Sequence, residues 1–130
     1  MKREIKFRGL NSKGAWIYGM PTYDMKYMFE HESINSVDNY EIDPKTVGQY
    51  TGLKDKNEKE IYEGDIVISK CDVSVLYVVK FGQYMYSDAC FFLEEISDIN
   101  PPLRFFSRGI EQTEIIGNIY QNPELLETVP

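Results

Sequence analysis

A Glu63-Gly64-Asp65 tripeptide is the local motif of this chain in which a side chain could do chemistry. Asp65 could be one half of a carboxylate pair for acid-base catalysis, which needs a second acid at a defined separation. The sequence does not identify that second acid. In the structural alternative, Gly64 makes a turn and Asp65 bonds its own backbone at the start of a strand. The pattern favours the structural interpretation.

His31, the one histidine, stands between Glu30 and Glu32. A zinc site would need further His or Cys ligands, and Cys71 and Cys90 lie too far apart to form a CxxC pair. A Ser-His-Asp triad would have to use His31. We therefore expect His31 in an exposed loop and both cysteines as small buried thiols.

Glycine-rich motifs that cradle phosphates are missing from the sequence, which contains neither GxGxxG nor GxxxxGK followed by Ser or Thr. The sequence therefore assigns no catalytic, cofactor-binding or metal-binding residue, and it leaves the binding residues unknown. It predicts a protein that is not an enzyme and uses no cofactor. A hydrolase that uses Asp65 with another acid or with His31 is the alternative, and it requires those groups to converge in one pocket. Several glycines are instead expected at turns, bulges or close strand approaches: Gly48, Gly52, Gly82, Gly109 and Gly117.

The charge balance opposes binding to nucleic acids and to anionic membranes. Lys and Arg number 14 against 21 Asp and Glu, which gives a net charge of -7. A small basic cluster near the N-terminus is expected to be a solvated strand face; it consists of Lys2, Arg3, Lys6 and Arg8. No apolar run is long enough to span a bilayer and none follows Met1 as a signal peptide would, so we expect a cytoplasmic protein.

Alternating apolar residues predict strands along most of the chain. Residues 3–9 and 15–20 predict a hairpin, and the β-branched run 73–81 is the clearest strand. Further strands are expected at residues 47–50, 60–68, 84–93, 103–106 and 113–120, with one or two short ones possible within 22–44. The last strand is apolar on both faces and is therefore expected to be central or covered. Asn122 and Pro123 predict one short C-terminal helix.

Short strands spaced about ten residues apart predict an all-β fold, a small barrel or sandwich. The length of 130 residues fits a single domain, in which we distinguish residues 1–60 and 61–130. Aromatic residues make up 14% of the chain, more than a core of this size readily hides. Some tyrosines should therefore be exposed at a protein interface.

The segment VGQYTGLKDKNEKEIYEGDIV, residues 47–67, resembles the central block of the YopX family of bacteriophage and prophage proteins. IKFRG at residues 5–9, WIYG at 16–19 and EIIGNIYQNPELL at 114–126 are similar to the family's opening and closing blocks, in the same order. The resemblance implies a β fold whose later half is like an SH3-type barrel beginning near Glu63. It also implies a phage-derived accessory protein in a bacterial cytoplasm, and it brings no catalytic residue or ligand with it.

Two kinds of function remain open after this comparison. The first is an accessory protein that acts through protein contacts, with itself as a homo-oligomer or with a host protein. The alternative is a nucleic-acid-associated module, because small barrels often present a strand face to DNA or RNA. One departure from the family pattern bears on structure: Glu58 follows Asn57 where the family commonly has Gly. A type I′ turn with Glu58 at its second central position would place Glu58 at a positive φ, which Gly tolerates and Glu does not.

Overall fold

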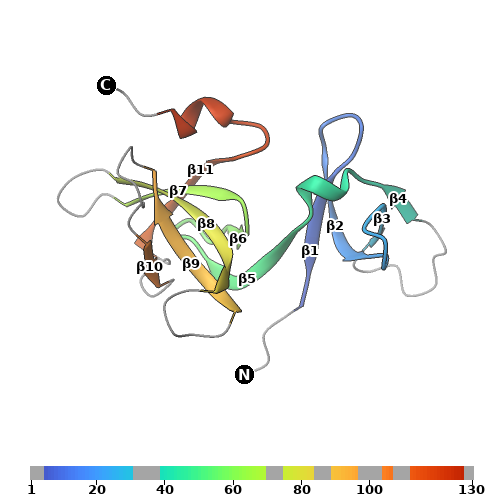
Figure 1. The fold of residues 1–130 in the computed structure, drawn as a ribbon, viewed down its shortest axis with the longest axis horizontal. Helices are drawn as coiled ribbons and strands as arrows, with labels where there is room; N and C mark the ends of the chain where they lie inside the picture. The colour runs from blue at the N-terminus through green and yellow to red at the C-terminus, as the bar shows by residue number, and fades with distance from the viewer. Residues whose placement is uncertain are drawn as a thin grey trace. The chain divides into compact units, whose positions relative to one another are not determined.

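The structure, a computed structural model, describes residues 5–30, 39–69, 75–83, 89–96, 104–106 and 112–127 (Figure 1). The strands of these residues are β1 (Phe7–Leu10), β2 (Trp16–Pro21), β3 (Tyr27–Glu30), β4 (Asn39–Glu41), β5 (Gly48–Lys54), β6 (Glu60–Tyr62), β7 (Asp65–Ser69), β8 (Val75–Gln83), β9 (Ala89–Glu95), β10 (Arg104–Phe106) and β11 (Glu114–Asn118). Two short 3-10 turns accompany them, η1 (Pro44–Thr46) and η3 (Pro123–Leu126).

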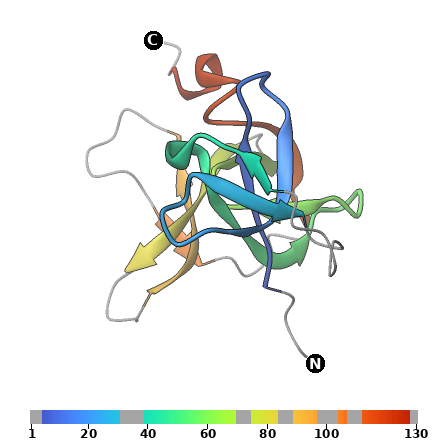
Figure 2. The same cartoon turned by 90° about the vertical axis from the view of Figure 1, so that its right-hand side faces the viewer.

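These strands form two antiparallel sheets, which confirms the all-β prediction. One sheet has the order β4-β3-β2-β1-β5-β6 and the other has the order β10-β9-β8-β7-β11. The longest pairing joins β8 to β9, and these two strands run side by side in both views (Figure 2). Neither sheet closes into a barrel in the described strands, so the SH3-like fold of the second half stays a prediction.

The chain divides into two compact units, Met1–Gly52 and Leu53–Pro130. The division falls inside β5, whereas our sequence-based division between residues 60 and 61 falls inside β6. Charge is distributed unequally between the units. The first has seven basic and seven acidic residues, and the second has seven basic and 14 acidic residues. The whole net charge of -7 therefore belongs to the second unit.

The core of the second unit is apolar and is made by four strands. Its buried members are Ile61, Val67, Val79 and Leu93, against which Leu53, Tyr77 and Ile115 pack. Tyr77 and Val79 come from the same face of β8, as the alternation of that strand predicts. Phe81, the next residue on this face, is instead 42% exposed. This face of β8 therefore packs on the core only in the middle of the strand.

Two hairpin turns, one in each unit, are built in the same way. In the first, Asn11 donates its N–H to the Ala15 carbonyl and Gly14 donates to the Asn11 carbonyl. In the second, Asp55 donates to Lys59 and Glu58 donates to Asp55. The fourth residue of each turn has a positive φ, 79° at Gly14 and 67° at Glu58. This geometry is a type I turn followed by a left-handed residue. It confirms the positive φ predicted for Glu58, but the predicted type I′ turn is wrong, because Lys56 and Asn57 are the central residues and Asn57 has no positive φ.

Replacing Glu58 with Gly is expected to leave stability unchanged or to raise it by a few tenths of a kcal/mol, since the left-handed strain of about 1 kcal/mol exceeds the entropy that Gly adds to the unfolded chain. Gly14→Ala is the matched control. Gly14→Ala introduces at the equivalent turn position the left-handed backbone strain that Glu58→Gly removes. The added Cβ at residue 14 has open space around it. The urea midpoint should hold or rise for the first variant and fall for the second. A fall for Glu58→Gly would contradict the shared turn geometry.

Three sequence-based predictions are wrong in detail. The strand expected at residues 60–68 is two strands, β6 and β7, because the Glu63-Gly64 turn separates them. Gly82 is not a turn residue, since it lies within β8 and pairs with Cys90. β11 is neither central nor covered on both faces, since it lies at the edge of its sheet and Ile116 is 39% exposed. The two strands found in residues 22–44 agree with prediction; Gly109 lies outside the described residues.

The predicted C-terminal helix is present only as the 3-10 turn η3. Pro123 occupies its first turn, as expected. The Asn122 side chain does not cap this turn, because its Oδ1 accepts the Asn118 N–H at 3.1 Å. Asn122 therefore ties the chain after β11 back to the end of that strand.

Candidate functional site

The structure places the Glu63-Gly64-Asp65 motif at the turn between β6 and β7. Gly64 has a φ of 93°, and the buried Asp65 accepts the Tyr62 N–H through Oδ2 at 2.8 Å. This hydrogen bond confirms the predicted turn role of Gly64 and Asp65. It gives no support to Asp65 as a catalytic acid.

The other residues considered for chemistry form no site in the described part of the chain. His31 and Cys71 lie outside the described residues, and Cys90 is a half-buried thiol in β9 with no disulfide. Within the described residues, no three His, Cys, Asp or Glu side chains gather as metal ligands would.

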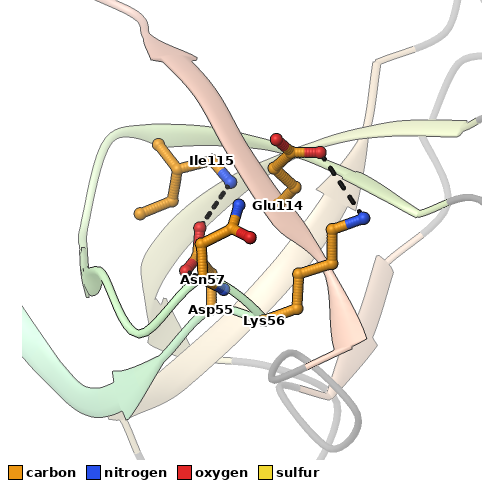
Figure 3. Close-up of polar contacts among 5 residues, drawn as sticks. All are labelled: Asp55, Lys56, Asn57, Glu114 and Ile115. Atoms are coloured by element: carbon orange, nitrogen blue, oxygen red, sulfur yellow. Dashed lines mark hydrogen bonds and ion pairs between the residues drawn. The ribbon is translucent and has the colours of Figure 1, made fainter.

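Asp55 is the polar residue that the sequence analysis missed. Its side chain is 4% exposed, and its Oδ1 accepts the N–H groups of Asn57 and Lys59 at 2.8 and 2.9 Å. Its Oδ2 accepts the Ile115 N–H of β11 at 3.0 Å (Figure 3). Burial opposes ionisation of this carboxylate, but the three backbone hydrogen bonds and the Lys59 charge outweigh it and lower the pKa of Asp55 below its ordinary value.

The Asp55 turn covers the open edge of β11. Besides the bond from Ile115, the Lys56 N–H donates to the Thr113 carbonyl at 3.0 Å. The Lys56 ammonium also lies 3.5 Å from the Glu114 carboxylate, an exposed pair that adds little stability (Figure 3). The central and closing sequence blocks thus meet here. The edge of β11 is bonded by a loop where a neighbouring strand would otherwise bond it.

An exposed apolar patch crosses β2 and β3 of the first unit. Tyr18 and Met20 alternate on β2, Met20 pairs with Phe29 of β3, and Tyr27 follows on the same side of β3. These four side chains, here called the aromatic face, are between 40% and 47% exposed. The opposite side of these strands carries Met28, which is completely buried. The sheet therefore buries one side and leaves large apolar side chains on the other.

Two cations of the N-terminal basic cluster contact aromatic rings beside this face. The Arg8 guanidinium carbon lies 3.9 Å from the centre of the Trp16 ring, and the Lys6 ammonium lies 5.4 Å from that of Tyr50. Arg8 is only 5% exposed, and it pairs across the strands with Tyr18. The prediction of a solvated basic strand face is therefore wrong at Arg8, because its guanidinium stacks on a ring. Lys2 and Arg3 lie outside the described residues.

The described residues include no helix of the length and apolar character that a membrane span requires.

The fold and these surfaces define an all-β protein of two open antiparallel sheets. The sequence matches the profile described as YopX protein over residues 4–127, and the chain belongs to the YopX family. The structure is similar to the crystal structure of protein EF1440 from Enterococcus faecalis, with a TM-score of 0.58 and 25% sequence identity. That match covers 97% of this chain and 100% of the other. A search of curated proteins finds no match.

Proposed function

We propose that this protein is a phage- or prophage-encoded accessory protein, not an enzyme, that acts in the bacterial cytoplasm through protein contacts made by the aromatic face. The observation that carries the proposal is the exposure of Tyr18, Met20, Tyr27 and Phe29 on one side of β2 and β3. Exposed aromatic and methionine side chains that adjoin one another are typical of protein interfaces. Equal numbers of acidic and basic residues in the first unit also favour an apolar contact there.

We expect the contact to be with a second copy of the chain, and the mass in solution tests it. Light scattering during size-exclusion chromatography at about 50 μM should give a mass above the 15.2 kDa of one chain, since micromolar association is ordinary for an apolar patch of a few side chains. The double variant Met20→Ser/Phe29→Ser should return the mass of one chain. Tyr23→Ser is the matched control, because Tyr23 is fully exposed and lies outside the aromatic face.

A wild-type chain that stays monomeric would exclude self-association and leave a host protein as partner. Parallel captures from host lysate with the wild type, with Tyr23→Ser and with Met20→Ser/Phe29→Ser then test whether a host protein binds through the aromatic face. A protein recovered by the wild type and by Tyr23→Ser, but not by the double variant, would support contact through the aromatic face. Equal recovery by all three would overturn the proposal.

A nucleic-acid-associated role is the second candidate. It is favoured by the position of Lys6 and Arg8 among aromatic rings on the side of the sheet that carries Tyr18. It is opposed by the net charge of -7 and by the burial of Arg8, which keeps that guanidinium from phosphates. Tight, salt-sensitive binding of a labelled oligonucleotide, lost on Lys6→Gln, would favour this candidate over protein contacts.

A further inference from the structure

Three methionines lie in the hairpin of β2 and β3, and the fold gives them different exposures. Met20 belongs to the aromatic face and is 47% exposed. Met25 lies in the turn between the two strands, outside the aromatic face, and is 40% exposed. Met28 lies on the opposite side of the sheet and is completely buried. One short segment therefore has a thioether inside the aromatic face, one outside it and one in the core.

Met20 occupies a position among all the other members of the aromatic face. Tyr18 is two residues before it on β2, and therefore on the same side of the sheet. Phe29 is its direct partner across the strands, and Tyr27 is its diagonal neighbour on β3. A polar group introduced at Met20 would therefore stand between aromatic residues of both strands, where the proposed contact needs an apolar surface.

The thioether of an exposed methionine is open to two-electron oxidation by hydrogen peroxide. A lone pair of the sulfur attacks one peroxide oxygen, so that an S–O bond forms and the O–O bond breaks. The sulfur loses two electrons and the peroxide gains them. The transferred oxygen gives its proton to the departing hydroxide, which leaves as water. The resulting sulfoxide is polar, whereas the thioether was apolar.

We propose that Met20 is an oxidation-sensitive switch in the aromatic face, where hydrogen peroxide forms the sulfoxide and the sulfoxide releases the second copy of the chain. The inference rests on the proposed function, because it requires the aromatic face to be the contact between two copies. In a two-fold symmetric pair the same patch occurs on both sides, so one oxidation per chain places two sulfoxides in the contact. The contact is therefore expected to weaken about tenfold or more.

Access of peroxide to Met20 should itself depend on association. A residue inside the contact is accessible in the single chain and covered in the pair, so mass action protects it as the protein concentration rises. Peptide mapping by mass spectrometry measures the oxidation rate of each methionine at a fixed excess of peroxide. Between about 1 and about 100 μM protein the rate at Met20 should fall about threefold or more, for a dissociation constant of about 10 μM. The rate at Met25 should stay constant, and Met28 should stay reduced.

Partial oxidation of the wild type separates the effect of Met20 from that of other oxidised residues. Size-exclusion chromatography at about 50 μM divides the partly oxidised protein into heavier and lighter fractions, and each fraction is mapped. Met20 sulfoxide should be enriched in the lighter fraction, and Met25 sulfoxide should be equal in both. Methionine sulfoxide reductases with a dithiol, which becomes a disulfide as water is released, should return the lighter fraction to the heavier mass.

Met25→Leu is the matched control variant, because it removes the exposed methionine outside the aromatic face and keeps Met20. Its mass should fall on peroxide treatment as that of the wild type does. Equal amounts of Met20 sulfoxide in both fractions, or a heavier mass that persists after Met20 is oxidised, would overturn the switch and leave the proposed function standing. A wild type that has the mass of one chain before peroxide is added would instead overturn the contact between copies, and the switch with it.

Discussion

Asp55→Asn is expected to lower the free energy of unfolding by about 2 to 3 kcal/mol, because it leaves a backbone N–H without its charged acceptor. The remaining Oδ1 can still accept the N–H groups of Asn57 and Lys59, as the amide oxygen of Asn11 does for Lys13 and Ala15 in the equivalent turn. The new amide nitrogen, however, faces the Ile115 N–H, so two donors meet. Urea unfolding at neutral pH measures the loss directly.

The reciprocal change in the other turn is the control. Asn11→Asp keeps an acceptor for both local N–H groups, those of Lys13 and Ala15 in the same turn. It should therefore change stability by less than about 0.5 kcal/mol, the range usual for surface substitutions. Equal losses for Asp55→Asn and Asn11→Asp would show that the bond to Ile115 contributes nothing.

The lowered pKa of Asp55 makes its contribution depend on pH. Its ordinary value is 3.8, and the folded value is lower. Its stabilisation is therefore fully present above the unfolded pKa and is lost as the pH falls through the folded one. The difference in unfolding free energy between wild type and Asp55→Asn should stay constant from about pH 7 to pH 5 and narrow below about pH 4.

Local chemistry explains which parts of this fold are predictable from sequence. The hairpin β1–β2 follows from alternation and from the Asn11 to Gly14 turn, and Glu63-Gly64-Asp65 was correctly interpreted as a turn followed by a strand. Both depend on residues that are adjacent in the sequence. The exposure of tyrosines was predictable from composition, but the particular four-residue face required the pairing of β2 with β3.

The position of β11 was not predictable, because it depends on residues that are far apart in the sequence. Ile115 and Ile116 made both faces of the segment apolar, which is usual for a central strand. The open edge of β11 is instead bonded by Asp55, which is 60 residues away along the chain, and no local sequence pattern predicts that contact. Asp55 itself looked like one polar residue of a polar turn, since its burial and its third hydrogen bond arise only when β11 lies alongside.

Gly64→Ala is expected to lower the free energy of unfolding by about 2 to 3 kcal/mol, the sum of left-handed strain and a tight contact. Its φ of 93° is one that residues with a Cβ rarely adopt. An added Cβ would also lie 3.1 Å from Cε2 of Tyr120. The hydrogen bonds to Val79 and from Ile119 hold both sides of the residue, so the backbone has little freedom to relax.

Gly14→Ala separates the two contributions, because Gly14 also has a positive φ, 79°, but nothing lies within 4 Å of its added Cβ. That variant should lose only a few tenths of a kcal/mol in urea unfolding, the left-handed strain of about 1 kcal/mol less the unfolded-chain entropy that Ala removes. In a Tyr120→Ala background, Gly64→Ala should then cost about as little as Gly14→Ala, since the double-mutant cycle removes the ring that the Cβ meets. If Gly64→Ala lowers the free energy of unfolding as much in the Tyr120→Ala variant as in the wild type, the whole loss comes from the backbone conformation of residue 64 and not from the contact with the ring.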